Sequence, residues 1–412
     1  MSVIRTVLLN VLLLTVNATF TIAQGVGEFK GVIVNERQEP VPYVNIRTTQ
    51  LTAGTVSNED GRFLLKIAQT NLQDTLILSC IGYSTGRISL TELSQTVEKT
   101  ITLSSATVLL NELVITPISG LDLVKKALTR ISENYQNQPF MMDGFYRESI
   151  EQNDKLISLV EAIISVHKSS YVDFNASDQM KLKKGRKAVD ENESEILKHM
   201  TISGGLRVDL VKYGSHFLVS QNFNLYDYTL KESLTDGKQD TVFVVEFDQK
   251  DALKLPLLKG KIYIDKQNYA IAGVEYGYSP KGIEYLNQYD RRQRKDMKKV
   301  NMYLESKYAL TTVTYARLLN KWYLQQARSV HQFQVTDQKK EKSIVWYKAD
   351  ISITEIDLKN IQSFKKEEEL ITFGVSISKQ MEGTYDQKFW ENYNYIVPAE
   401  GAKKKAGILL KN

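Results

Sequence analysis

Residues 54–63 read Gly-Thr-Val-Ser-Asn-Glu-Asp-Gly-Arg-Phe, and they carry the clearest fold signal in the chain. Asp60-Gly61 favours a tight turn, because glycine readily adopts the positive φ that such a turn requires. The dipeptide lies between the strand-like segments 54–56 and 63–65. The sequence therefore predicts a β-hairpin here.

Turn-forming glycine and proline residues recur on both sides of this hairpin, from residue 28 to residue 104. Pro40 and Pro42 have no amide hydrogen to donate, which suits a loop that enters an edge strand. Gly82 suits a bulge after an apolar strand over 76–80. Six or seven short strands at this spacing, without a helix, predict a seven-stranded type of β-sandwich over residues 24–106.

The order of these motifs resembles the carboxypeptidase-regulatory-like family, whose fold is a transthyretin-type β-sandwich. The resemblance rests on the strand that begins at Gly31, the loop over 40–43, the Asp60-Gly61 turn and Ile81-Gly82-Tyr83. In that family the two glycine motifs are structural. The resemblance therefore implies an interaction module, and it carries no catalytic residue to this chain.

Residues 107–118 predict an extended linker. Within it, Leu110-Asn111-Glu112-Leu113-Val114-Ile115-Thr116 resembles the segment that follows this domain in TonB-dependent outer-membrane receptors. Those receptors continue into a plug and a barrel of about 22 strands. We do not expect a transporter from 412 residues, and contact of residues 110–116 with an energy-coupling protein stays open.

The first 23 residues predict a Sec signal peptide. Arg5 supplies the positive end, residues 7–14 are apolar apart from Asn10, and a small-residue cleavage site ends at Ala23, before Gln24. No later apolar run is long enough for a spanning helix. We expect export to the periplasm or outer-membrane periphery of a Gram-negative cell, with no transmembrane span after signal removal.

Charge and cysteine content narrow the possible partners. The 53 basic and 48 acidic residues give a net charge of +5, which is nearly balanced for this length and does not suit a nucleic-acid binder. The one cysteine, Cys80, lies in an apolar strand-like run, so we expect a buried thiol and no disulfide. We therefore expect an envelope protein, a glycan or an apolar ligand as partner, and no nucleic acid.

Residues 119–400 predict an α+β domain. Ser119 and Asp122 form a capping-box pattern, and apolar residues then recur at helical spacing as far as Tyr135, before Pro139. Strand-like segments follow at 140–149, 156–167, 226–232, 241–248, 259–265, 269–278, 300–319, 322–335 and 344–356. Paired as hairpins, they predict a large curved antiparallel sheet with the amphipathic helix against one face.

Three further segments of this domain have their own predictions. Asp236-Gly237 predicts the turn of one hairpin. The charge-dense residues 169–205 predict a long excursion with a short helix near 194–200, and residues 401–412 predict a basic tail. In the segment from Gly144 to Glu148 the chain is similar to envelope proteins that carry the same N-terminal domain. The hairpin over 260–271 more loosely resembles the lipoprotein-carrier half-barrel.

Motifs for catalysis and metal binding are missing from the sequence. None of the four histidines is followed by glutamate at the spacing of zinc carboxypeptidases, and serine-hydrolase and nucleotide-binding motifs are absent. We therefore expect no catalytic residue, no cofactor and no metal. Two residues are candidates to face a ligand: Glu161, alone in an apolar strand, and Trp322, after the Asn320-Lys321 turn.

These observations favour a mainly β, secreted, non-enzymatic envelope protein that acts as an interaction or ligand-binding module. Two alternatives stay open. A soluble carrier of an apolar ligand or lipoprotein would need an apolar cavity on the concave face of the sheet. A glycan or peptide hydrolase would need carboxylates that converge in a cleft.

Overall fold

The computed structural model describes residues 26–93, 95–109, 118–173, 175–193, 197, 208–235, 241–293, 302–371, 375, 377–381, 389–390 and 392–409. The predicted signal peptide lies outside these residues, together with its cleavage site at Ala23 and Gln24. Residues 110–116 and the predicted Asp236-Gly237 turn also lie outside them. No helix in the described part of the chain has the length and apolar character needed to cross a membrane.

Seven short strands form the predicted N-terminal sandwich. They are β1 (Val26–Val34), β2 (Asn45–Thr48), β3 (Gly54–Val56), β4 (Arg62–Ala68), β5 (Thr75–Ser79), β6 (Gly86–Ser89) and β7 (Lys99–Thr102), with 3₁₀ turns η1 (Gln69–Asn71) and η2 (Leu90–Glu92). Sheet β4-β1-β7 packs on sheet β3-β2-β5-β6. Buried apolar side chains such as Ile33, Ile46 and Leu65 fill the space between them.

The Asp60-Gly61 turn is present, but the prediction of a simple hairpin is wrong. Gly61 has φ of 72°, and the Asn58 side chain accepts hydrogen bonds from the amides of Asp60 and Arg62, both at 2.9 Å. Strands β3 and β4, which flank the turn, belong to different sheets. The turn is therefore a corner between the two layers of the sandwich.

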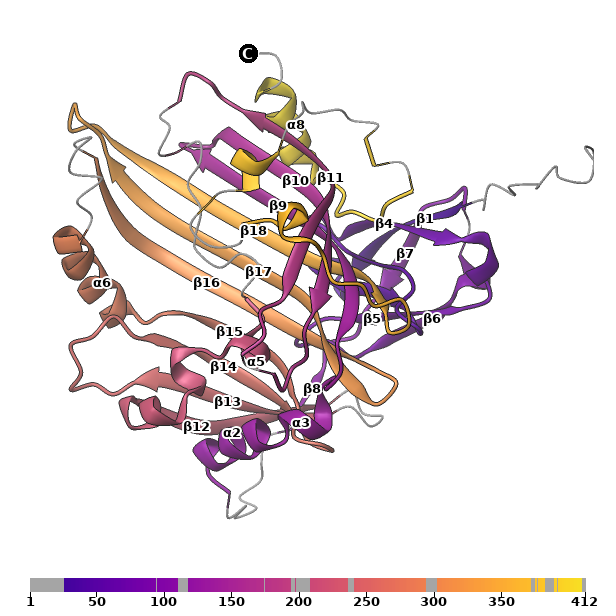
Figure 1. The fold of residues 1–412 in the computed structure, drawn as a ribbon, viewed down its shortest axis with the longest axis horizontal. Coiled ribbons are helices and arrows are strands. Elements are labelled where there is room, and N and C mark those ends of the chain that lie inside the picture. The colour runs from indigo at the N-terminus through magenta and orange to yellow at the C-terminus, as the bar shows by residue number, and fades with distance from the viewer. Residues whose placement is uncertain are drawn as a thin grey trace, which may run out of the picture.

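The rest of the chain is dominated by an eleven-stranded antiparallel sheet, as the hairpin pattern predicts. Its strands are β8 (Thr107–Leu109), β9 (Phe140–Gln152), β10 (Lys155–Lys168), β11 (Gln179–Val189), β12 (Tyr226–Thr235), β13 (Thr241–Gln249), β14 (Leu258–Asp265), β15 (Ile271–Tyr278), β16 (Tyr303–Leu318), β17 (Lys321–Thr336) and β18 (Lys342–Asp357). The order is β11-β10-β9-β18-β17-β16-β15-β14-β13-β12-β8. Figure 1 shows the long strands crossing the molecule, with the sandwich beside one end of them.

Short helices and 3₁₀ turns accompany this sheet. They are α2 (Gly120–Thr129), α3 (Ile131–Asn134), α5 (Leu210–Tyr213), α6 (Pro280–Gln293), α8 (Glu400–Leu409), η3 (His216–Leu218), η4 (Ser220–Leu225), η5 (Lys366–Glu368) and η6 (Ile377–Gln380). Ser119 caps α2 as predicted, because its Oγ accepts a hydrogen bond from the Asp122 amide at 3.1 Å. The predicted single helix is split at Arg130, whose amide bonds back to the carbonyls of Ala127 and Leu128.

The two faces of the large sheet have different environments, because successive side chains of a strand point to opposite sides. On β10, Val160, Ala162 and Ile164 belong to the main apolar core on the inner face. Glu161 and Ile163 point to the outer face, where Ile163 packs with Phe145, Trp390 and Ile396. The outer face is therefore the one that meets the C-terminal segment.

Three segments differ from their predictions. Residues 179–189, inside the predicted excursion, form edge strand β11, because β10 supplies a long hydrogen-bonding partner and lysines are tolerated at a sheet edge. Residues 401–409 of the predicted basic tail are helical, and Ala406 packs against Leu156 and Leu159 of β10. Residues 107–109 of the predicted linker form β8, which pairs with β12.

Candidate functional site

Glu161, the acid that stands alone in its strand sequence, lies between two arginines. Its side chain is 1% exposed. Strand register places Arg147 of β9 and Arg186 of β11 directly opposite it, one on each side. Arg147 Nε donates to Oε1 at 2.8 Å, and Arg186 Nη2 lies 2.6 Å from Oε2. Each carboxylate oxygen of Glu161 is therefore paired with an arginine side chain.

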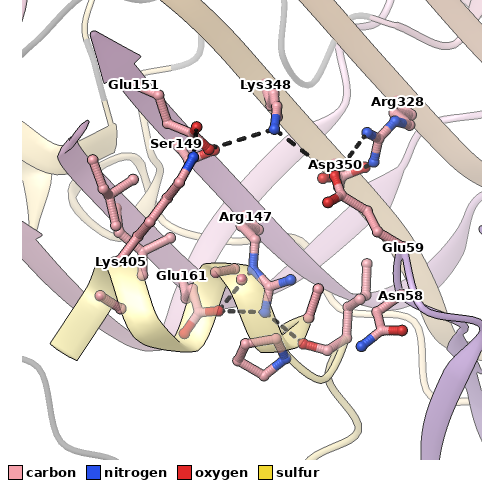
Figure 2. Close-up of a pocket in the computed structure, with 18 of the residues that line it drawn as sticks. Asn58, Glu59, Arg147, Ser149, Glu151, Glu161, Arg328, Lys348, Asp350 and Lys405 are labelled. Atoms are coloured by element: carbon pink, nitrogen blue, oxygen red, sulfur yellow. Dashed lines mark hydrogen bonds and ion pairs between the residues drawn. The ribbon is translucent and has the colours of Figure 1, made fainter. Parts of the chain in front are cut away.

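Glu161 borders a cavity of about 170 Å³ that we call the charged pocket. Its walls are the outer faces of β9, β10, β17 and β18, the sandwich loop at 58–59, and α8 (Figure 2). Each lining carboxylate has a cation beside it: Glu59 lies 3.6 Å from Arg328, Glu151 lies 2.5 Å from Lys405 and 3.4 Å from Lys348, and Asp350 lies 3.0 Å from Arg328. The charges compensate one another in pairs.

This pairing joins the sandwich to the large sheet. Glu59 and Tyr43 come from the sandwich, and Arg328 comes from β17 and stacks over the Tyr43 ring at 3.6 Å. Burial alone would raise the pKa of Glu59, but Lys348, the Tyr43 hydroxyl and Arg328 hold it below its ordinary value. A general acid needs a carboxyl that stays protonated near neutral pH. The geometry of this pocket suits a structural clamp better than an acid–base pair.

Trp322, the second candidate from the sequence, borders a different cavity. It lies at the start of β17 and is 8% exposed. The cavity beside it measures about 620 Å³ and separates the sandwich sheet β3-β2-β5-β6 from strands of the large sheet, including β16 and β17. We call this space the interdomain cleft. The structure thus places the two predicted candidates in separate sites.

Three residues that line the interdomain cleft each have a buried polar atom without a hydrogen-bond partner: Asn45 Oδ1, Arg47 Nε and Trp322 Nε1. Asn45 and Arg47 alternate along β2 with Ile46, which points into the sandwich core. The other ends of both side chains reach the large sheet, where Asn45 Nδ2 donates to Thr314 Oγ1 at 3.3 Å and Arg47 Nη2 to the Arg317 carbonyl at 3.2 Å. An unpartnered buried polar group costs about 1–3 kcal/mol.

The sandwich can be assigned by comparison with known proteins. Residues 29–115 match the family model of the CarboxypepD_reg-like domain. This match confirms the resemblance seen in the sequence motifs. Among curated proteins, no sequence matches the chain significantly.

Two solved structures show distant similarity. A DUF1329 family protein from Desulfovibrio piger is 11% identical, and the match covers 58% of this chain and 92% of that protein with a TM-score of 0.23. Lipovitellin, in a structure that describes lipid–protein interactions, is 8% identical, with 59% and 28% covered and a TM-score of 0.25. Similarity at this level carries no argument about function.

On the inner face of the sheet, a buried ionic network lies far from the CarboxypepD_reg-like domain in sequence. Lys168 Nζ lies 2.7 Å from carboxylate oxygens of both Asp178 and Asp209, and all three side chains are almost fully buried. Asp209 also accepts a hydrogen bond from the Tyr315 hydroxyl at 2.9 Å. The network ties the segment before β11 and helix α5 to the sheet.

Sequence reasoning missed Asn45 and Arg47 as site residues. The sequence does contain a signal, because apolar and polar residues alternate with the period of a strand in Val44-Asn45-Ile46-Arg47. Both buried apolar partners pack in the core of the CarboxypepD_reg-like domain. The alternation indicates that Asn45 and Arg47 leave that core, but it does not indicate that a second sheet covers them.

Metal binding has no candidate site in the described part of the chain, where no group of three or more histidine, cysteine, aspartate and glutamate side chains is placed to hold an ion. Cys80 is a free thiol and lines the interdomain cleft. Burial raises the pKa of this thiol to about 12. The thiol is therefore a slow nucleophile.

Proposed function

We propose that this protein is an exported, non-enzymatic ligand-binding protein, and that its binding site is the interdomain cleft. The observation that carries the proposal is that three residues lining one cavity, Asn45, Arg47 and Trp322, each have a buried polar atom without a partner. Binding sites typically measure about 300–1,000 Å³ and contain a few placed polar groups. The cleft, at about 620 Å³, has both properties.

The charged pocket supports this choice by contrast. It is smaller, at about 170 Å³, and its carboxylates already have cationic partners. A ligand there would have to displace existing ion pairs. In the cleft, a ligand that reached the three buried atoms would instead supply partners that the protein itself does not provide.

The hydrolase alternative has less support. Asp143 and Glu355 do lie opposite each other on β9 and β18, and burial together with Asp143 raises the pKa of Glu355. However, Asp143 is also paired with Lys183 at 2.5 Å. Neither acid lines the charged pocket or the interdomain cleft. Neither of these two cavities could therefore present a substrate to this pair of acids.

The carrier alternative also has less support. It needs open apolar space on the concave inner face of the sheet. That face instead packs a large core that includes Tyr135, Phe140 and Tyr323, with ring centroids of Phe140 and Tyr323 5.1 Å apart. The Lys168 network adds buried charge to the same face. A hydrocarbon ligand would have to displace both.

The binding proposal can be tested with the mature chain, because its single cysteine reports on the cleft. Thermal unfolding is measured with a panel of neutral sugars, organic acids, dipeptides and fatty acids. Any stabilising compound is then tested for protection of Cys80 against alkylation, by intact mass spectrometry at pH about 8.5. We expect at least one class to stabilise the chain and to slow alkylation of Cys80.

Controls separate the cleft from other sites. Trp322→Phe removes the unpartnered indole N–H and keeps an aromatic ring, so it should weaken binding. Trp346→Phe, on β18 beside Tyr308, should not. Stabilisation by a compound that leaves alkylation unchanged would place the site elsewhere, and a panel without any stabilising compound would contradict the binding function.

Export is the second part of the proposal, and it is supported by residues 1–23 of the sequence and by the CarboxypepD_reg-like domain. Mass spectrometry of the chain recovered from a Gram-negative envelope fraction should give an N-terminus at Gln24. An intact Met1 in that fraction would contradict cleavage after Ala23.

A further inference from the structure

The interdomain cleft has an excess of positive charge. Three arginines line it: Arg47 and Arg87 from the sandwich, and Arg317 from β16. Within the residues that the structure describes, none of these guanidinium groups forms an ion pair with a carboxylate. The Arg47 guanidinium donates to the backbone carbonyls of Thr48 and Arg317, and the Arg317 guanidinium donates to Asn320 Oδ1.

Strand register brings two of these cations onto the same face of the sandwich. Arg47 on β2 lies opposite Ile77 on β5, which in turn lies opposite Arg87 on β6. Directly opposite residues have Cβ atoms about 4.5–5.5 Å apart, so Arg47 and Arg87 flank one isoleucine. Burial, and next the charge of Arg87, lower the pKa of Arg47 to about 10. An anion between them would offset the repulsion that Arg87 exerts on Arg47.

The carboxylates near this group are already engaged. Asp265 lines the cleft, and its Oδ1 accepts hydrogen bonds from the amides of Gln267 and Asn268 at 3.0 and 2.9 Å, in the turn between β14 and β15. Asp74 accepts hydrogen bonds from the Thr49 hydroxyl and the Thr75 amide. Neither acid forms an ion pair with Arg47 or Arg87 in the described structure.

We propose that the interdomain cleft binds a hydroxylated organic anion of the sugar-acid or sugar-phosphate type. Its carboxylate or phosphate oxygens would accept hydrogen bonds from the Arg47 guanidinium and face Arg87, since planar guanidinium groups bind such oxyanions well. Ligand hydroxyls would bond to Asn45 and Trp322 once the buried Asn45 Oδ1 and Trp322 Nε1 turn toward the cleft. This inference rests on the proposed binding function and specifies its ligand class.

Calorimetric titration of the mature chain separates the parts of this ligand. The probes are glucuronate and glucose 6-phosphate, with glucose, acetate and inorganic phosphate as fragments. We expect both acidic sugars to bind and to slow alkylation of Cys80. The affinity of each fragment should be lower by a factor of about ten or more. Equal affinity for inorganic phosphate and glucose 6-phosphate would contradict the hydroxylated part of the proposal.

Arginine variants test the recognition. Arg87→Gln changes an exposed residue and should fold normally, so its affinity for glucuronate should fall about tenfold if Arg87 faces the anion. Arg47→Gln should lose at least as much. Arg37→Gln makes the same change of charge in the exposed turn between β1 and β2, and should bind as the parent does. Equal losses in all three variants would indicate only a general charge effect and would overturn the assignment.

The outcomes also separate this inference from the proposed function. Cys80 protection by a neutral compound, with no binding of either acidic sugar, would overturn the anionic ligand and leave the cleft as a binding site. Absence of protection by any compound in the panel would overturn both.

Discussion

Replacing Glu161 by glutamine should destabilise the protein strongly. The substitution keeps the shape of the side chain but removes the negative charge between Arg147 and Arg186, whose side chains are 15% and 2% exposed. Removing one partner of a buried ion pair typically costs about 3–5 kcal/mol, because the other charge stays buried without compensation. Arg147 keeps a hydrogen bond to the Ile396 carbonyl at 2.5 Å, so we expect a loss near the lower end, about 3 kcal/mol.

Urea-induced unfolding, followed by circular dichroism, measures this loss. Glu151→Gln is the matched control, because Glu151 lies on the same face and also pairs with two lysines, Lys348 and Lys405, whose side chains are 27% and 32% exposed. Partly exposed pairs contribute about 0–1 kcal/mol. Equal, small effects of both substitutions would refute the view that Glu161 is the buried centre of a clamp. Ligand binding in the cleft should survive in both variants.

Three further changes test other parts of the structure. Lys168→Met should lower the free energy of unfolding at pH 7 by about 3–5 kcal/mol. Burial alone would raise the pKa of Asp178, but Lys168 holds this pKa below its ordinary value. Without Lys168 the buried carboxylate is stabilised less, and this loss of stability should shrink at low pH, where the carboxyl group is protonated. Unfolding measured from pH 7 to pH 3 tests this dependence. In thermal unfolding, Gly61→Ala should destabilise the protein more than Gly82→Ala. Both glycines have positive φ, which costs about 1–2 kcal/mol when a side chain is present. A Cβ on Gly61 would in addition lie 2.4 Å from the Ile33 carbonyl oxygen, whereas a Cβ on Gly82 would meet nothing within 4 Å. Burial lowers the pKa of His331 to about 4, so the parent should lose stability as pH falls from about 6.5 towards 4, and His331→Phe should flatten that dependence.

The strands of the large sheet were predictable because their signals are local. Strands rich in apolar and β-branched residues flank local turn signals, as in β14 and β15 around residues 266–270. Strand β11 was not predictable in this way. Its segment has Lys181, Lys183, Lys184, Arg186 and Lys187, and its strand state depends on the edge that β10 offers. Helix α8 likewise depends on β10 for the apolar contact of Ala406.

The candidate sites were less predictable, because their partners are distant in sequence. Glu161 was singled out for being alone in an apolar strand, but its pairing with Arg186 requires the unpredicted strand β11. Asn45 meets Thr314 across 269 positions, and Arg47 meets Arg317 across 270. The periodicity of apolar residues within a short segment cannot indicate contacts between residues so far apart in the sequence. The cleft exists only because the sandwich and the large sheet meet there.

The C-terminal segment before α8 is one element that holds this docking. The Asn394 side chain pairs with the backbone of Lys66 on β4, accepting from its amide at 2.7 Å and donating to its carbonyl at 2.9 Å. Next to it, the Tyr395 carbonyl accepts from Thr55 Oγ1 at 3.1 Å, and the Ile396 carbonyl accepts from Arg147 of β9 at 2.5 Å. The segment therefore bonds to both the sandwich and the sheet.

Asn394→Ala should loosen this connection. It removes two hydrogen bonds and leaves half-buried backbone groups of Lys66 without their partner, which costs about 1–3 kcal/mol. Because the cleft lies between the same two units, alkylation of Cys80 should become faster in the variant under native conditions. Asn360→Ala, which affects an exposed asparagine bonded to Asp357, should change neither stability nor alkylation. A destabilised Asn394→Ala protein with unchanged alkylation of Cys80 would mean that the segment stabilises the sandwich without setting the width of the cleft.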